Sequence, residues 1–298
     1  MPAPTLHDLR AFAAVAACRS FRQAADDLGL SPSSLSHTMR GLERHLGVRL
    51  LHRTTRSVSL TEAGERLLTR LNPVLHELDR ALGEVDAFRG QPGGTVRINA
   101  PEVAARLLLR RVVPVVLARY PDVSVDLVTE GRLVDIVAEG FDAGVRLAGS
   151  VPDDMVAVRF GGEARFVAVA APAYLDRAGV PQTPDELRAH RCIRHRLPSG
   201  KLYRWEFERA AEEVEVDVTG PLTLDRMELM IEAAADGLGV AYVMESAARP
   251  WLDDGRLALV LPDWCPPIAG MLLYYPGHRQ VPSGLRAFVD TLREVLPG

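Results

Sequence analysis

Apolar residues recur at helical spacing in three short stretches at the start of the chain. The first predicted helix begins near Thr5, which opens a capping-box pattern. The second begins after Ser20 and ends at Gly29, and the third follows Ser31, with Pro32 at a position that needs no backbone N–H. Two short helices joined by a tight turn predict a helix-turn-helix. The alternative is a helical hairpin with a solvated polar face.

The third predicted helix has one apolar and one polar face. Small side chains on the polar face would let the helix enter the major groove of DNA, where hydroxyl groups can bond base edges or phosphates. The polar face consists of Ser33, Ser34, Ser36, His37, Arg40 and Arg44, and the apolar face of Leu35, Met39, Leu42 and Leu46. The DNA contacts that we expect from this helix are Ser31, Ser33, Ser34, His37 and Arg40.

Two short strands are predicted after Gly47, which ends the third helix. They cover residues 50–53 and 57–60 and enclose a short turn. Such a hairpin is a wing, and it would place Arg53 and Arg56 beside the DNA backbone or in the minor groove.

A long helix is predicted from Thr61 to about residue 88. Apolar residues recur along it at heptad spacing, which is typical of a helix with a helical partner. Packing on the protein's own body is the alternative, but a glycine-rich break at 90–94 separates the helix from that body and favours self-association. The expected dimer contacts are Leu68, Leu71, Leu75, Leu78, Leu82 and Val85.

The rest of the chain alternates between strand and helix patterns, which predicts an α/β fold with a largely parallel sheet. Such sheets bind ligands at the carboxyl ends of their strands. The predicted strands are 95–100, 123–129, 142–147, 166–171, 220–224, 240–243 and 257–261, and the predicted helices are 102–119, 133–139, 225–236 and 283–296. We therefore divide the chain into residues 1–61, 62–92 and 93–298.

Charge separates the first of these parts from the rest. The chain has a net charge of −4, yet residues 1–61 hold eight Arg against four Asp and Glu, a net +4, which leaves −8 for the remainder. A small basic module on an acidic body is typical of a DNA-binding domain joined to another function.

Catalytic and metal-binding motifs are not found in the sequence. The three cysteines, Cys18, Cys192 and Cys265, show no metal-ligand spacing, so we expect no metal, no cofactor and no enzymatic activity. A binding protein or enzyme that carries a helix-turn-helix is one alternative. A redox sensor using Cys192 and Cys265 is another, although buried inert thiols fit a sparse cysteine content better.

Residues 20–64 closely resemble the signature of LysR-type transcriptional regulators. The matching residues are Ser20, Phe21, Ala24, Ala25, Leu28, Ser31, Ser33, Ser36, Leu42, Glu43, Leu46, Gly47, Leu50, Arg53, Leu60, Thr61 and Gly64. Met39 stands where Ile or Val is usual, and Leu51 where Phe is usual. The resemblance continues through the segments GTVRINAP, DIVAEGFDAGVRL, VAAPAYL, AADGLGVAYV and LLYYP, and so covers the whole chain.

This resemblance implies a fold and a set of partners. The expected fold is a winged helix-turn-helix, a linker helix, and a body like the two lobes of a periplasmic binding protein, with lobe crossings near 162–166 and 267–271. Ser33, Ser34, His37 and Arg40 would face the DNA groove and Arg53 the backbone. The expected partners are double-stranded DNA with a near-palindromic operator, a small-molecule effector, a second copy in a dimer or tetramer, and RNA polymerase.

The effector is expected between the two lobes. The candidate contacts are Pro101, Glu102, Val103, Thr129, Glu130, Arg146, Leu147, Ala148, His195, Arg196, Asp225, Arg226 and Tyr242, each of which fits a surface role about equally well. Many relatives have a small hydroxyl residue where Glu102 stands, at the positive end of a helix. A cleft holding Glu102, Arg196 and Arg226 favours a zwitterionic or polar effector over a simple carboxylate.

No apolar run reaches the ~18 residues that a membrane span needs, and the N-terminal residues lack a secretory-signal pattern. The sequence therefore predicts a cytoplasmic bacterial protein associated with the nucleoid, without a membrane partner.

Overall fold

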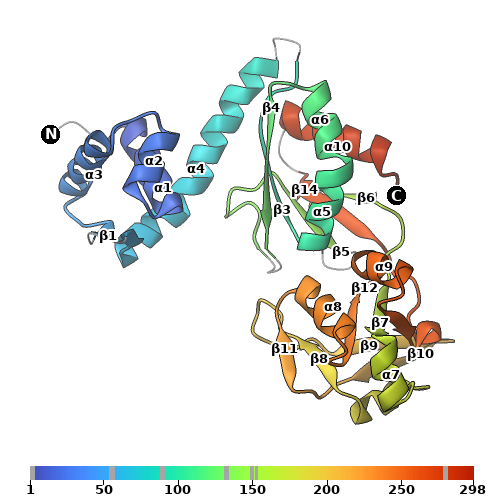
Figure 1. Cartoon of the computed structure of the whole chain (residues 1–298). Coiled ribbons are helices and arrows are strands. Elements are labelled where there is room, and N and C mark those ends of the chain that lie inside the picture. The colour runs from blue at the N-terminus through green and yellow to red at the C-terminus, as the bar shows by residue number, and fades with distance from the viewer. Residues whose placement is uncertain are drawn as a thin grey trace.

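The computed structural model describes residues 4–53, 58–87, 91–130, 134–147, 151, 154–277 and 281–298. Figure 1 shows a helical head at one end, a long helix leading away from it, and two α/β lobes, one above the other. The head and each lobe have an apolar core of their own. The expected order of a helix-turn-helix, a linker helix and a two-lobed body is confirmed.

Three helices and a hairpin form the head. They are α1 (Leu6–Cys18), α2 (Phe21–Asp27), α3 (Pro32–Leu46), β1 (Leu51–Arg53) and β2 (Val58–Leu60), the two strands pairing antiparallel. The predicted caps are present: Thr5 and Asp8 form a capping box, Ser20 accepts a bond from the Gln23 backbone N–H, and Ser31 caps α3. Local polar signals thus set where the head's helices begin.

The linker helix α4 (Glu62–Ala87) begins after Thr61, whose Oγ accepts a hydrogen bond from the Gly64 backbone N–H at 3.0 Å. It leaves the head at one end and reaches lobe one at the other (Figure 1). Pro73 lies inside the helix without ending it.

Lobe one has a five-stranded sheet in the order β4-β3-β5-β14-β6. Its strands are β3 (Gly94–Ala100), β4 (Val123–Thr129), β5 (Ala143–Leu147), β6 (Met155–Phe160) and β14 (Met271–Pro276), and its helices α5 (Glu102–Arg111), α6 (Val113–Arg119) and α10 (Ser283–Val295). β3 runs parallel to β4 and β5, whereas β14 pairs antiparallel with β5 and β6.

Two predicted helices of lobe one are corrected by the structure. The predicted helix 102–119 is divided into α5 and α6 at Val112, just before Pro114, which has no N–H to continue the helical bonding. The predicted helix 133–139 is wrong, because residues 134–140 form turns and no helix. There, Asp135 caps a single turn: its Oδ1 accepts bonds from the backbone N–H groups of Val137 and Ala138 at 3.0 Å each, and its carbonyl accepts one from the Glu139 N–H at 3.0 Å. The turn ends at Phe141, whose N–H donates to the Ile136 carbonyl at 2.7 Å, so no helix continues from it.

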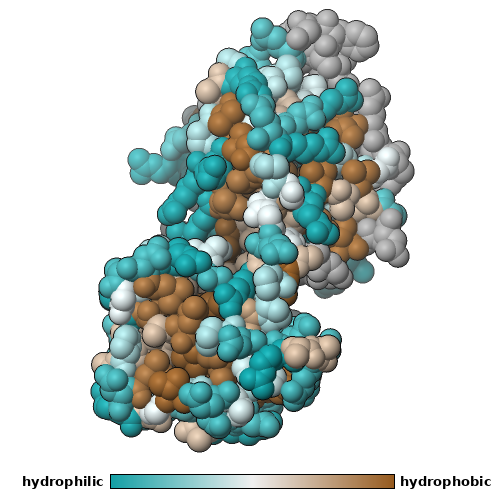
Figure 2. Space-filling model, turned by 90° about the vertical axis from the view of Figure 1, so that its right-hand side faces the viewer, coloured by the Kyte–Doolittle hydropathy of each residue, from teal (hydrophilic) through white to brown (hydrophobic). Residues whose placement is uncertain are grey.

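Lobe two has a second five-stranded sheet in the order β11-β8-β12-β7-β13, together with a separate hairpin. Its strands are β7 (Phe166–Ala170), β8 (Cys192–His195), β11 (Leu222–Leu224), β12 (Val240–Met244) and β13 (Ala258–Val260); the hairpin is β9 (Trp205–Arg209) and β10 (Glu212–Val216). The helices are α7 (Pro172–Ala178), α8 (Met227–Ala235) and α9 (Glu245–Asp253), with short 3-10 turns η1 (Pro184–Ala189) and η2 (Pro262–Trp264). On the face drawn in Figure 2, the lower lobe gathers apolar side chains within a hydrophilic border.

The chain passes between the lobes twice, at adjacent places. The two crossing segments pair as an antiparallel bridge, in which the backbone N–H groups of Ala164 and Ile268 each donate to the other's carbonyl, at 3.0 and 2.7 Å. The predicted crossings at 162–166 and 267–271 are therefore confirmed. Two crossing segments that lie side by side make a junction at which lobe rotation would be concentrated.

Candidate DNA-binding face and inter-lobe sites

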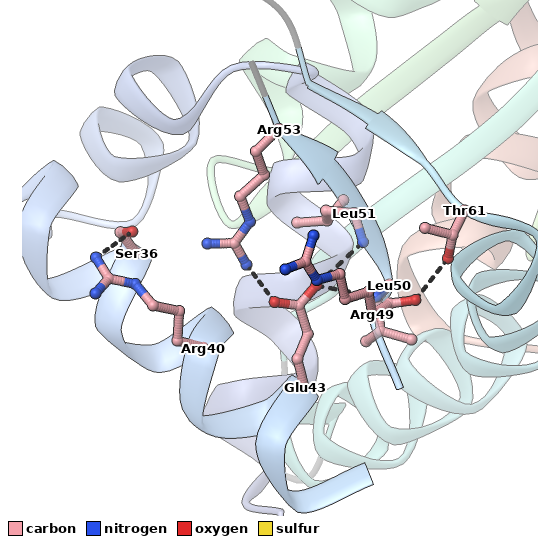
Figure 3. Close-up of polar contacts among 8 residues, drawn as sticks. All are labelled: Ser36, Arg40, Glu43, Arg49, Leu50, Leu51, Arg53 and Thr61. Carbon is pink, nitrogen blue, oxygen red and sulfur yellow. Dashed lines mark hydrogen bonds and ion pairs between the residues drawn. The ribbon is translucent and has the colours of Figure 1, made fainter. Parts of the chain in front are cut away.

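The exposed face of α3 carries the polar residues that the sequence singled out. Ser33, Ser34, His37 and Arg40 are all exposed, and Arg40 Nη2 donates to Ser36 Oγ at 3.1 Å (Figure 3). Ser31 has a structural task, because its Oγ accepts a bond from the Ser34 backbone N–H at 3.1 Å and lies 3.0 Å from Ser33 Oγ. Ser31 therefore fixes the start of the helix that presents the other four side chains.

Glu43 holds the wing against α3, a role that the sequence analysis did not assign. Its Oε1 accepts bonds from the backbone N–H groups of Leu50 and Leu51 at 2.9 and 3.2 Å, and its Oε2 accepts one from Arg53 Nη2 at 2.7 Å (Figure 3). Thr61 extends this contact by donating to the Arg49 carbonyl at 2.7 Å. One carboxylate thus sets the angle between the recognition helix and the hairpin.

Arg53 is bound within the head, although we expected it to face the DNA backbone. Its side chain is 25% exposed, it is paired with Glu43, and its guanidinium carbon lies 4.9 Å from the centre of the Phe21 ring. These two internal contacts give Arg53 a structural role, which is to position the wing. Arg56, the other predicted wing contact, lies outside the described residues.

Part of the predicted dimer seam of the linker helix packs on the head instead. One predicted dimer contact, Leu71, is therefore corrected. Leu71 is only 6% exposed and belongs to the head's own core, with Leu68 and Leu75 packed at the edge of that core. Leu71 therefore cannot face a partner. Leu78 is half-buried, and the side chains of Leu82 and Val85 lie outside the described part of the chain.

An apolar position that the heptad pattern did not select is exposed on α4. Val74 is 64% exposed, and Leu78 follows four residues later, one helical turn along the same face. The exposed stripe of α4 is thus offset from the stripe that packs on the head.

The candidate effector residues do not meet in one place. Leu147 and Tyr242 line a cavity of about 750 Å³ beside the lobe junction, whereas Val103 lines a separate cavity of about 430 Å³ between α5, α8 and α9. Pro101 stands at the N-cap of α5, and Thr129 is exposed at the end of β4. Ala148 lies outside the described residues. Glu130 lies close enough to Arg146 to interact with its charge.

Glu102 is paired across the lobes. Its Oε1 accepts a bond from Arg106 Nη2 at 2.7 Å, and its Oε2 accepts one from Arg226 Nη1 at 3.2 Å, while Arg106 Nε lies 3.4 Å from Glu228 Oε1. Burial opposes ionisation of Glu102, but the bonds from the arginines outweigh it and hold the pKa of this carboxyl below its ordinary value. Two acids and two arginines balance, so Glu102 is no uncompensated charge awaiting a ligand.

The other predicted charges are bound within their own lobes. Among the described residues, Arg196 forms no ion pair with Glu102. Its Nη1 donates a hydrogen bond to the Gly200 carbonyl at 3.3 Å. Arg146 is 7% exposed and donates to Asn99 Oδ1 at 2.7 Å. Burial lowers the pKa of His195, an effect that the nearby Asp225 partly opposes. Of the expected mixed-charge cluster of Glu102, Arg196 and Arg226, the structure brings together only Glu102 and Arg226, as one inter-lobe ion pair.

The 750 Å³ cavity has an aromatic wall, of which the sequence analysis singled out only Tyr242. Tyr242 stacks on Phe166 at 5.5 Å and on Tyr203 at 6.4 Å between ring centres, and Trp205 stacks on it at 5.5 Å. The alternation of aromatic and acidic residues in 205–208 is a strand signal that could have revealed the hairpin behind this wall.

Burial makes Cys192 and Cys265 unsuited to redox sensing. Cys192 and Cys265 are 1% and 2% exposed, and burial raises the pKa of the Cys192 thiol to about 12. Burial also raises the pKa of Cys265. Protonated, enclosed thiols react slowly, so the inert interpretation is favoured.

Family comparisons agree with this geometry in both halves of the chain. Residues 6–65 match the bacterial regulatory helix-turn-helix protein, lysR family, and residues 89–297 match the LysR substrate binding domain. The chain belongs to the LysR family. It is a transcriptional regulator with a helix-turn-helix DNA-binding domain and an effector-binding domain.

Relatives of this LysR-type regulator cover its full length. It is 44% identical over 288 residues to the HTH-type transcriptional regulator YcaN of Escherichia coli (strain K12), a match that covers 97% of this chain and 94% of the relative. PgrR of the same organism is 40% identical over 287 residues, covering 96% of each. The full-length Vibrio cholerae virulence activator AphB is structurally similar, with a TM-score of 0.65, 25% identity, and coverage of 97% and 99%.

Regulators of the LysR type bind DNA and small-molecule effectors and form oligomers. In the described part of this chain, no helix combines the length and the apolar character that a membrane crossing requires.

Proposed function

We propose that this LysR-type regulator reads a near-palindromic operator with the exposed face of α3 and responds to a small molecule bound beside the lobe junction. The observation that carries the proposal is the α3 face itself, whose start is capped by Ser31 and whose far end is tied to the wing by Glu43. A fixed helix with exposed hydroxyl, imidazole and guanidinium groups fits reading of the major groove. Ser33, Ser34, His37 and Arg40 are the proposed base and phosphate contacts.

The functional units in this proposal are residues 1–61 for DNA binding, 62–92 for association of two copies, and 93–298 for the effector. Two heads on one side of the duplex need half-sites about 34 Å apart, or a multiple of that distance. A dimer, or a tetramer built from two dimers, supplies them. The protein would work in the bacterial cytoplasm at the nucleoid, with RNA polymerase as a partner and without catalytic activity.

A DNA-binding experiment with matched variants tests the proposal. Fragmented genomic DNA of the source bacterium is bound to the full chain, the retained fragments are sequenced, and affinities for the best site are measured by fluorescence anisotropy. Replacing His37 by Ala should alter the base preference at one position in each half-site by about 1–3 kcal/mol, the value of one good base contact.

The control is Arg188→Ala, which removes an exposed arginine from η1 in lobe two. It should leave affinity and base preference unchanged. Retention of the full base preference and affinity by the His37→Ala variant would show that α3 does not read the operator in this way.

A further inference from the structure

The cavity beside the lobe junction is built from both kinds of group that attract a cation. Its volume is about 750 Å³, and it is lined by Leu147 of lobe one, by the crossing segment around Ile268, and by the aromatic side chains Phe166, Tyr203 and Tyr242. Four further lining residues are Glu206, Glu208, Glu213 and Glu215 of the β9–β10 hairpin. No Lys, Arg or His is among its described lining residues.

The aromatic rings form a continuous wall. Phe166 and Tyr203 both stack on Tyr242, with interplanar angles of 18° and 17°. The Tyr242 hydroxyl donates to the Glu206 carbonyl, which fixes the ring against the hairpin. Tyr242 is only 5% exposed, so the rings that a cation can reach are those of Phe166 and Tyr203, which are half-buried. The π-faces of aromatic rings are negative and attract ammonium and guanidinium groups.

The hairpin adds negative charge in an arrangement that costs stability. In the antiparallel register, Glu206 lies opposite Glu215 and Glu208 lies opposite Glu213, so like charges face one another in two successive pairs on one face. Among the described residues, only one of these four carboxylates forms an ion pair. Glu215 lies 3.2 Å from Arg204, and both side chains are more than half exposed. A cation in the cavity would relieve the repulsion that the fold leaves in place.

The ion pairs around Glu102 differ from the hairpin, because their positive and negative charges are equal in number. Glu102 and Glu228 are matched by Arg106 and Arg226 within 3.4 Å. The unbalanced charge near the junction therefore lies on the hairpin and not on Glu102, which was the residue that suggested a zwitterionic effector.

We propose that the 750 Å³ cavity binds an organic cation, an ammonium or guanidinium group carried on an apolar body. This inference rests on the proposed function, since it names the effector class of that same site. A metal ion fits less well, because the described residues hold no group of three His, Cys, Asp or Glu side chains arranged for metal binding. The aromatic wall receives the apolar body, and the glutamates face the charge.

The test uses three probes of similar size that differ in charge: benzyltrimethylammonium, benzyl alcohol and phenylacetate. Each is titrated calorimetrically into the full chain, with and without excess magnesium chloride. The cation should bind about tenfold more tightly than the alcohol, in line with a partly desolvated cation–π contact. Phenylacetate should bind no better than the alcohol, and magnesium should compete only through general screening of charge.

Two matched variants locate the binding. The double variant Glu206→Gln/Glu208→Gln removes charge from the cavity wall and relieves cross-strand repulsion, so the hairpin should remain folded. It should weaken binding of the cation about fivefold, the sum of two exposed charge contacts. Glu212→Gln removes a charge from the same hairpin at a position that does not line the cavity, and it should have no effect.

Three results would overturn the inference: no binding of the cation, equal or tighter binding of phenylacetate, or equal losses in the double variant and in Glu212→Gln. Operator binding is measured on the same preparations. A chain that binds DNA but not the cation refutes the inference alone, whereas one that binds the cation but no DNA refutes the proposed operator function.

Discussion

The head and the lobe junction are held together by contacts of different range. In the head, Glu43 reaches Leu50, Leu51 and Arg53, which are seven to ten residues away. At the junction, Glu102 meets Arg226 across 124 residues of chain. The head contact is largely enclosed, with Glu43 only 13% exposed, whereas Arg226 is 62% exposed. A short-range, enclosed contact suits a rigid reading head, and an exposed contact between lobes suits a joint that moves.

The linker helix α4 offers the clearest test of this difference between a rigid and a mobile region. One of its faces packs on the head, and another is exposed. Replacing Val74 by Glu places charge on the exposed stripe and should separate the dimer. Loss of the second head should weaken operator binding by about 100-fold or more, the usual gain from linking two binding modules.

Light scattering and anisotropy measure the two effects of Val74→Glu. Thr69→Glu is the control, since it adds the same charge at an exposed position on another face of α4. An unchanged mass for Val74→Glu, or an equal loss in both variants, would place the dimer contact elsewhere.

The enclosed contact of the head gives the next largest effect. Replacing Glu43 by Ala leaves two backbone N–H groups and the Arg53 guanidinium without their acceptor, at a cost of about 3 kcal/mol in the free energy of unfolding of the head. Urea unfolding followed by circular dichroism measures that cost.

Glu43→Gln retains an acceptor oxygen and should cost less than Glu43→Ala, while Glu65→Gln, an exposed change on α4, should cost almost nothing. Equal stability of Glu43→Ala and the wild type would show that the wing does not depend on this carboxylate.

The inter-lobe pair should give the smallest effect, and this effect should depend on pH. Because the folded pKa of Glu102 lies below its ordinary value of 4.5, its contribution is fully present above that value and is lost as pH falls through the lowered folded pKa. Solvent screening limits this contribution to less than about 1 kcal/mol.

Urea unfolding at a series of acidic pH values should therefore show a shallower loss of stability for Glu102→Gln than for the wild type. Asp263→Asn, an exposed change in lobe two, serves as the control and should follow the wild type. A pH dependence unchanged by Glu102→Gln would mean that the pair adds nothing to the folded state.

Local signals in the sequence determined most of the head. The starts of its helices depend on side chains three residues from the backbone groups they bond, as with Ser20 and Gln23 or Ser31 and Ser34, so the pattern alone is sufficient. The strands β3, β4 and β5 of lobe one were also found, because apolar and polar residues alternate along β3 and β4 and a short, largely apolar run marks β5. The strands β6, β8 and β14 and the β9–β10 hairpin were missed, since short strands owe their state to neighbours far along the chain.

Only the tertiary structure decided what the predicted residues do. Heptad spacing placed Leu71 in a dimer seam, but helical and heptad periods nearly coincide over three turns, and packing against the head chose which stripe was buried. Sequence could not show that Arg53 is paired with Glu43, nor that Glu102 is balanced by Arg226. A side chain's charge is fixed by its residue type, whereas its partner is fixed by which segments the fold brings together.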